Sequence, residues 1–176
     1  MSKNTTSKFP SFKDLFGAFI VFFARFVNFM PNFSPVGAFG FFGKNPIPYF
    51  LVIVVFDIIY KGFYTGFLYT YLGFFLYFVL GRYAKEDTKK QVLLLPLASI
   101  LFFLVSNLGV YLNWYPKGFD NLLLCYVSAL PFFKMTILSD LFFGYGYLIV
   151  LKFIRVAQDN TNLPTLLRTK LIQSND

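Results

Sequence analysis

The sequence predicts an all-α fold, an integral membrane bundle of six transmembrane helices. The first observation is composition: 57% of the 176 residues are hydrophobic and 23% are aromatic, with 27 Phe among them. The second is charge, because only 14% of the residues are charged, against about a quarter in soluble domains. A soluble fold of this composition would expose large apolar patches, whereas a bilayer accepts them.

Hydrophobic runs are the third observation, and they supply the candidate helices. They fall at 14–30, 33–43, 46–60, 63–81, 91–113, 119–130 and 131–151. An upright helix needs about 20 residues to cross a bilayer, and about 17 is the lower limit. The runs 33–43 and 119–130 are therefore doubtful spans, and the run 46–60 is short.

The first run has the features of an uncleaved span. Lys3, Lys8 and Lys13 precede it, as in a secretory signal, but the bulky stretch "FARFVNFMP" offers no small-residue cleavage site. The second run, 33–43, is short for a span, so it would need shelter from neighbouring helices or a thinned bilayer.

Basic residues choose between two topologies. In the first topology, the run 33–43 crosses the membrane and the run 119–130 forms a short helix in a loop on one face; twelve basic residues then lie on the opposite face and three on the loop's face. In the second topology, 119–130 crosses and 33–43 does not, and the basic residues divide nine against six. The positive-inside rule favours the first arrangement and places both termini and the loop 82–90 in the cytoplasm. The twelve are Lys3, Lys8, Lys13, Lys44, Arg82, Lys85, Lys89, Lys90, Lys152, Arg155, Arg168 and Lys170.

We expect one transmembrane domain over 1–155 and a polar cytoplasmic tail over 156–176. Within the tail, Thr161, Asn162 and Pro164 have the pattern of a helix start, so the tail either lies on the membrane surface or is frayed. The net charge of +8 is explained by Lys and Arg that flank spans, so we predict no nucleic-acid partner.

Several enzyme classes are excluded by composition. Histidine is absent and Cys125 is the single cysteine, which excludes an intrachain disulfide, His-ligated metal centres and His-dependent nucleophiles. Asp57 and Asp140 could form an acid–base pair, but no nucleophile or metal set accompanies them. Cys125 could ligate a soft metal, although a small buried hydrophobe is the favoured interpretation. We predict no enzyme activity, no cofactor and no metal.

Polar residues inside the spans are the candidate site. A charge within a bilayer costs about 2.5–3.5 kcal/mol, and such residues commonly mark binding sites. In the six-span arrangement they gather in the outer half of the bundle, below the segment 115–130, as an outward-facing cavity. The predicted ligand-binding residues are Arg25, Asn28, Asn32, Asp57, Asn107, Tyr111, Asn113, Trp114, Tyr126 and Asp140.

Structural roles compete with each of these assignments. Arg25 could pair with an aspartate and lock the bundle, and Asn107 and Asn113 could form hydrogen bonds between helices. Trp114 could be an ordinary aromatic residue of the membrane interface. The spacing of Gly37, Gly40 and Gly43 permits close helix packing, either inside the bundle or against another subunit.

Three stretches carry a family resemblance over most of residues 20–145: "PNFSPVGAFGFFG", "FFLVSNLGVYLNWYP" and "LLLCYVSALPFFKMTILSDLFFG". They resemble an uncharacterised family of small bacterial membrane proteins that looks like the S components of energy-coupling factor (ECF) transporters. The resemblance implies six helices in the bacterial inner membrane, with an outward cavity that binds a vitamin-type micronutrient.

The same resemblance implies partners, namely a transmembrane coupling subunit and two ATPases. The chain has no P-loop motif, so ATP would be hydrolysed by those partners. Many S components carry an Ala-x-x-x-Ala docking pattern in the first helix, but here Ala18 is followed four residues later by Phe22. Docking would then fall to Gly37, Gly40 and Gly43. The alternative function is a structural scaffold of the cell envelope, similar to the rod-shape morphogenesis subunit MreD.

Overall fold

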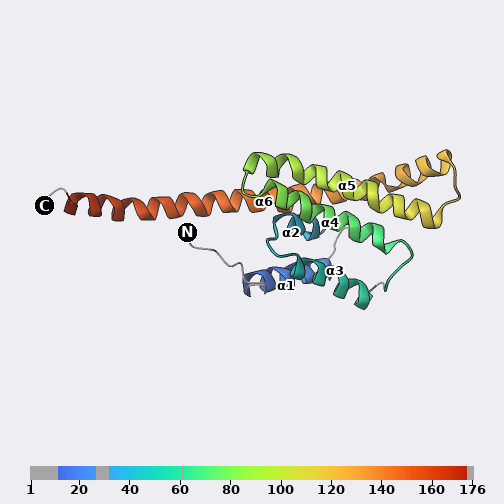
Figure 1. The fold of residues 1–176 in the computed structure, drawn as a ribbon, viewed down its shortest axis with the longest axis horizontal. Coiled ribbons are helices and arrows are strands. Elements are labelled where there is room, and N and C mark those ends of the chain that lie inside the picture. Colours follow the sequence, from blue (N-terminus) through green and yellow to red (C-terminus); the bar gives the residue numbers. More distant parts are fainter. Residues whose placement is uncertain (1–11, 27–31, 61, 174–176) are drawn as a thin grey trace. The chain divides into compact units, whose positions relative to one another are not determined.

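The computed structural model describes the backbone of residues 12–26, 32–60 and 62–173, and most of their side chains as far as Gln158. Within these residues the chain forms six α-helices and no strands (Figure 1), which confirms the all-α prediction. The helices are α1 (Phe12–Phe26), α2 (Val36–Phe42), α3 (Pro46–Tyr60), α4 (Phe67–Ala84), α5 (Thr88–Trp114) and α6 (Phe119–Gln173).

Two compact units make up the chain. The first comprises residues 1–144 and contains α1 to α5 with the first part of α6, and the second comprises residues 145–176. In the first unit α4 lies alongside α5, α2 packs against α4, and α1 packs against α3 (Figure 1). The predicted division at residue 155, between a membrane domain and a tail, stays a prediction.

Local sequence signals set the helix ends. Asp87 caps α5, because its carboxylate accepts hydrogen bonds from the backbone N–H groups of Lys89 and Lys90 at 3.0 and 3.2 Å. Gly66 precedes α4 with a φ of 92°, a left-handed conformation that glycine adopts without steric cost.

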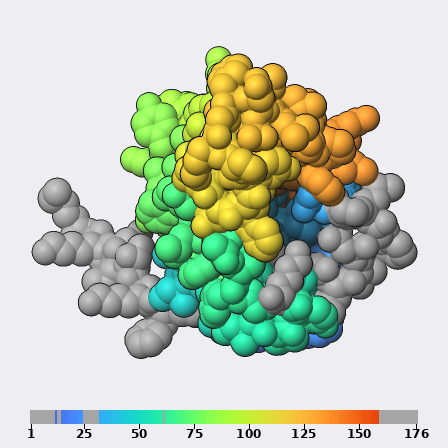
Figure 2. All heavy atoms as spheres, turned by 90° about the vertical axis from the view of Figure 1, so that its right-hand side faces the viewer, coloured from blue at the N-terminus to red at the C-terminus, as the bar shows by residue number. Residues whose placement is uncertain are grey.

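The connections between helices gather at two ends of the first unit. At one end, which we call the basic end, Arg82 donates a hydrogen bond to the carbonyl of Lys44 at 3.3 Å, and Lys44 lies 4.0 Å from Glu86. At the other end, the opposite end, the indole of Trp114 donates to the carbonyl of Thr65 at 3.3 Å. Figure 2 looks at the opposite end, where the yellow turn between α5 and α6 lies above the teal segment that follows α3.

The second predicted span is much shorter in the structure. Helix α2 has seven residues, which is about 10 Å at the helical rise and cannot cross hydrocarbon about 30 Å thick. It is instead packed inside the unit, because Gly81 of α4 approaches the carbonyl of Phe41 so closely that any side chain at Gly81 would overlap it. The run 33–43 is thus a buried short helix rather than a span of its own.

The run 119–130 also differs from the prediction of a separate short helix. Helix α6 runs without a break from Phe119 through Pro131, so the run is the beginning of the last helix. Proline removes one backbone donor, but apolar helices tolerate it where neighbouring groups and local adjustments satisfy the freed carbonyl. Pro96 lies inside α5 in the same way.

Two helices are long and apolar enough to cross a membrane, Thr88–Trp114 and Phe119–Gln158. A core helix of a soluble protein is mostly buried, whereas only 22% and 17% of the most apolar windows of these two helices are buried. Other large apolar side chains are exposed on every described helix except α2, among them Phe19, Ile58, Leu68, Leu93 and Phe142. These exposed faces indicate membrane association, since water would penalise patches of this extent.

Candidate functional site

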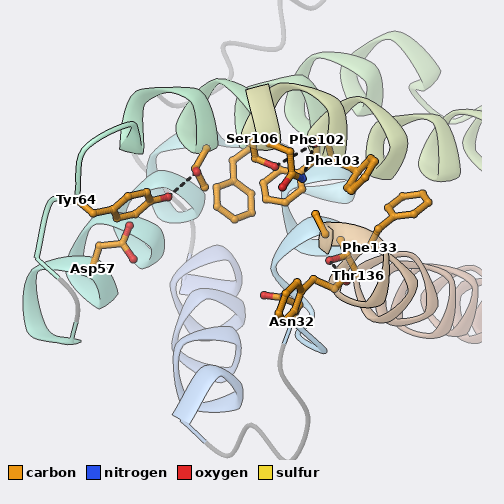
Figure 3. Close-up of a pocket in the computed structure, with 13 residues that line it drawn as sticks. Asn32, Asp57, Tyr64, Phe102, Phe103, Ser106, Phe133 and Thr136 are labelled. Carbon is orange, nitrogen blue, oxygen red and sulfur yellow. Dashed lines mark hydrogen bonds between the residues drawn. The ribbon is translucent and has the colours of Figure 1, made fainter. Parts of the chain in front are cut away.

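A cavity of about 280 Å³ lies in the first unit between the end of α3, the middle of α4 and α5, and the first part of α6 (Figure 3). Its lining combines polar groups with aromatic rings, the mixture typical of small-molecule sites. The lining residues are Asn32, Asp57, Tyr64, Thr70, Phe74, Phe102, Phe103, Ser106, Asn107, Ala129, Phe132, Phe133 and Thr136.

One polar side of the cavity comes from α3, α4 and their connection. Asp57, buried near the end of α3, accepts a hydrogen bond from the hydroxyl of Tyr71 at 3.0 Å. Beside it, the hydroxyls of Tyr64 and Thr70 lie 2.5 Å apart in a hydrogen bond (Figure 3). These contacts hold the segment after α3 against α4 and position the carboxylate at the cavity.

A second polar side comes from α5 and α6. The hydroxyls of Ser106 and Thr136 each donate to a carbonyl of their own helix, Phe103 at 3.4 Å and Phe132 at 3.0 Å. The amide of Asn107 donates to the carbonyl of Phe103 at 2.8 Å. Bonds of this local type are how hydroxyl and amide side chains satisfy their donors inside apolar helices.

Aromatic rings form the remaining walls in two contacting pairs. The ring centroids of Phe74 and Phe102 are 4.8 Å apart, and those of Phe103 and Phe133 are 4.6 Å apart. Both separations lie in the range of favourable aromatic contacts. The two pairs come from three helices, so they join α4, α5 and α6 around the cavity.

Three of the predicted ligand-binding residues line this cavity: Asn32, Asp57 and Asn107. Asn32 adopts a φ of 61°, a left-handed conformation that asparagine tolerates better than most residues. Asn28 and the side chain of Arg25 lie outside the described residues, so their predicted roles stay predictions.

Four other predicted residues lie toward the opposite end but do not line the cavity. Asn113 donates to the carbonyl of Gly109 in its own helix, and Trp114 to that of Thr65. The hydroxyl of Tyr111 exchanges hydrogen bonds with the backbone of Gly118, at 2.9 and 3.3 Å, which shapes the turn between α5 and α6. Tyr126 donates to the carbonyl of Leu104 at 2.7 Å and so joins α6 to α5.

Asp140 does not line the cavity but lies one helical turn beyond the lining residue Thr136, contrary to the expectation that all the polar residues share one cavity. Its carboxylate accepts a hydrogen bond from Ser99 at 2.8 Å. Ser99 is eight residues before Asn107 on α5, about 12 Å toward the basic end at the helical rise. The displacement arises because α6 begins at Phe119 rather than at Pro131, so Asp140 lies much farther along the helix than predicted.

A buried polar network surrounds Asp140. Besides Ser99, its carboxylate accepts hydrogen bonds from the hydroxyl of Tyr77 and from the backbone of Ala38 in α2. The neighbouring Ser139 accepts from the backbone N–H of Ser34 at 3.0 Å and donates to the Ser34 carbonyl at 2.5 Å. These bonds tie α6 to α4, α5 and the start of α2, which has no cap from its own side chains.

The predicted docking glycines differ in their surroundings. A side chain at Gly37 would overlap Asp140 and Tyr77, and one at Gly40 would overlap Tyr49. Both glycines are buried and serve close packing inside the unit. A side chain at Gly43 would meet backbone carbonyls at 2.8 Å and beyond. Docking of a partner at these glycines stays a prediction.

Some lining residues were not predicted from the sequence. Tyr64, Thr70, Ser106 and Thr136 carry hydroxyls inside or beside apolar runs, and that feature could have marked them. No signal distinguishes the five lining phenylalanines, because the chain contains 27 Phe. Over the described residues, no group of three His, Cys, Asp or Glu side chains is placed to hold a metal ion.

An all-helical fold with two long, mostly exposed apolar helices and a partly polar cavity indicates a helical membrane-associated protein. The chain belongs to a family of unknown function, DUF6580, whose model matches residues 14–162. No curated protein and no solved structure matches the chain. The resemblance to ECF S components stays a prediction, and the function is argued from the site.

Proposed function

We propose that the chain is the substrate-binding membrane subunit of a micronutrient uptake transporter. In this proposal it spans the bacterial inner membrane several times with both termini in the cytoplasm. The cavity near the opposite end opens outward and holds a vitamin-type ligand. A transmembrane coupling subunit and ATPases supply the energy.

The cavity between apolar helices carries this proposal. Polar side chains within a bilayer are costly, and those that persist commonly mark a substrate path. Here Asp57, Ser106 and Asn107 lie around one cavity, although the first is on α3 and the other two are on α5. A scaffold that only packs its helices has no need of such a cavity, because it would fill the space with side chains.

The test is to purify the full chain from its native membrane and identify co-purifying small molecules by mass spectrometry. We expect one compound at close to one equivalent, which is retained by the parent protein and lost from Asn107→Ala. Leu123→Ala, at an exposed position on α6, is the matched control and should retain it. Repeated purification without any bound compound would contradict the proposal.

A second function, a scaffold of the cell envelope, is favoured by the network around Asp140. This carboxylate is 1% exposed and accepts hydrogen bonds from Tyr77 and Ser99, as expected for a group that organises the bundle. The two functions differ in the cavity residues, since a scaffold would tolerate Asn107→Ala and Thr136→Val without loss of function. The test is to express each variant in a strain that lacks the gene and to measure growth on limiting micronutrients. Transport predicts that the variants fail to restore growth, and a scaffold predicts that they restore it.

A further inference from the structure

The basic end carries a concentration of positive charge on exposed side chains. Five basic and two acidic residues lie in the connection from α2 to α3 and around the turn between α4 and α5, which leaves a net charge of +3. All seven residues are exposed. We call the five basic side chains the basic surface; they are Lys44, Arg82, Lys85, Lys89 and Lys90.

The two acidic residues neutralise only part of this charge. Asp87 uses one carboxylate oxygen on the backbone at the start of α5, and its other oxygen lies 4.0 Å from the ammonium of Lys90. Glu86 lies 4.0 Å from Lys44, but both side chains are at least 80% exposed, and such ion pairs contribute little. Within the part of the chain that the structure describes, Lys85 and Lys89 form no ion pair.

Exposed apolar faces begin directly beside the basic surface. On α5, Leu93 lies one turn beyond Lys89 on the same face and is 71% exposed, and the exposed Leu97 follows one turn later. On α4, Tyr83 is 66% exposed, and the ammonium of Lys90 lies 5.4 Å from the centroid of its ring. Tyrosine and lysine at the end of an apolar face are typical of the boundary between hydrocarbon and lipid headgroups.

A phospholipid with an anionic headgroup matches both features. Its phosphate suits ammonium and guanidinium groups, because charge-assisted hydrogen bonds are the strong ones. Its acyl chains suit the exposed apolar faces of α4 and α5, which a soluble anion would leave uncovered. A zwitterionic phospholipid would cover the same faces, but it brings no net charge to the basic surface.

We propose that the basic surface binds anionic phospholipids, whose headgroups contact its lysines and Arg82 while their acyl chains lie along the exposed faces of α4 and α5. The bound lipid holds the turn between α4 and α5 at the surface of the membrane. This inference goes beyond the proposed function, because it concerns the basic end and needs no ligand in the cavity.

The experiment is native mass spectrometry of the full chain, released from detergent, with equal concentrations of two lipids that share the same acyl chains. The lipids are palmitoyl-oleoyl phosphatidylglycerol, which is anionic, and palmitoyl-oleoyl phosphatidylcholine, which is zwitterionic. One basic residue near a membrane surface changes the affinity for anionic lipid about fivefold. We therefore expect adducts of phosphatidylglycerol to exceed those of phosphatidylcholine by about tenfold or more. Raising ammonium acetate from about 0.1 to about 1 M should reduce this preference, because salt screens exposed charges.

Matched variants assign the preference to the basic surface. The double variant Lys85→Gln with Lys89→Gln should lose most of the preference, whereas Lys85→Arg with Lys89→Arg should keep it. The control is Lys117→Gln with Lys134→Gln, which removes the same charge from exposed positions outside the basic surface and should keep the preference. An unchanged preference in the folded double glutamine variant at Lys85 and Lys89 would overturn the inference, as would a preference that does not fall with salt.

Other outcomes identify a different occupant. Equal adducts of the two lipids, or an excess of phosphatidylcholine, would overturn the inference. Glycerophosphoglycerol, the headgroup without acyl chains, should not displace phosphatidylglycerol at the same concentration; displacement would show a site for soluble phosphate esters instead of a lipid surface. Preference for phosphatidylglycerol in a protein that retains no micronutrient would support this inference and contradict the proposed function alone.

Discussion

The hydroxyl of Tyr77 on α4 donates a hydrogen bond to the carboxylate of Asp140 on α6, and both side chains are 1% exposed. Ser99 on α5 donates to the same carboxylate oxygen at 2.8 Å. Side chains of three helices thus meet at the carboxylate of Asp140, which is buried away from solvent. Loss of one member leaves another polar group buried without its bond, which costs more than the bond itself contributes.

Tyr77→Phe should therefore destabilise the protein measurably. Removal of the hydroxyl takes one donor from a buried carboxylate, and we expect a loss of roughly 1–3 kcal/mol in the free energy of unfolding. The measurement is the thermal unfolding midpoint of the purified protein in detergent. Tyr126→Phe is the matched control, because its hydroxyl bonds a single backbone carbonyl at a half-buried position, so a smaller loss is expected. Equal decreases of the unfolding midpoint in both variants would show that the hydrogen bond to Asp140 stabilises the protein no more than a bond to a backbone carbonyl does.

Gly37→Ala tests the close approach of α2 to the same acid. An added methyl would overlap the carboxylate of Asp140 and the ring of Tyr77, so the helices would have to separate. Overpacking of this kind costs about 1–3 kcal/mol. Gly146→Ala is the control, because no atom beyond its chain neighbours and its own helix backbone lies within 4 Å of the added methyl, and alanine favours the helix by up to about 1 kcal/mol. Unfolding midpoints that fall in the first variant and hold or rise in the second would confirm the packing.

Much of the fold follows from hydrophobic runs and charge, and the exceptions have physical causes. The turns that carry Lys44 and the loop 82–90 were predicted on one face, and the contacts of Lys44 with Arg82 and Glu86 place both at the basic end. The hydrophobic run 131–151 predicts that the last span begins at Pro131. Pro131 lies inside α6 instead, since an apolar helix tolerates a lost donor when it is packed against neighbours.

That one difference explains the misplacement of Asp140. Nine residues separate Asp140 from Pro131, but 21 separate it from the observed start of α6 at Phe119, about 31 Å at the helical rise. Asn32, Asp57 and Asn107 do not depend on this helix start, and the structure brings them to one cavity. The aromatic walls could not be predicted, because a chain rich in Phe gives no reason to choose Phe103 over Phe75.

Variants of the cavity should weaken ligand binding, whereas variants of the network around Asp140 should lower stability. Thr136→Val removes a hydroxyl that bonds only its own helix carbonyl, so we expect the unfolding midpoint to change little while ligand binding weakens. Asp140→Asn should do the reverse, because its contacts are with Tyr77, Ser99 and Ala38 and it does not line the cavity. The readouts are the retained co-purifying compound and the unfolding midpoint, measured on the same preparations. Loss of both properties in both variants would show that the cavity and the network act as one structural element.

Orientation in the membrane is tested by cysteine labelling. The background is Cys125→Ser, which replaces the single cysteine, and Lys89→Cys and Lys117→Cys are introduced separately. Both lysines are exposed: Lys89 lies in the first turn of α5 at the basic end, and Lys117 lies in the turn between α5 and α6 at the opposite end.

If the basic end faces the cytoplasm, as the positive-inside rule predicts, an impermeant maleimide labels Lys117→Cys in intact cells. It labels Lys89→Cys after the membrane is opened. Denatured samples of each variant, labelled to completion, correct for expression. Labelling of Lys89→Cys in intact cells at the level of Lys117→Cys would place the basic turn outside and the cavity nearer the cytoplasm. Capture of a ligand from outside would then be impossible in this orientation.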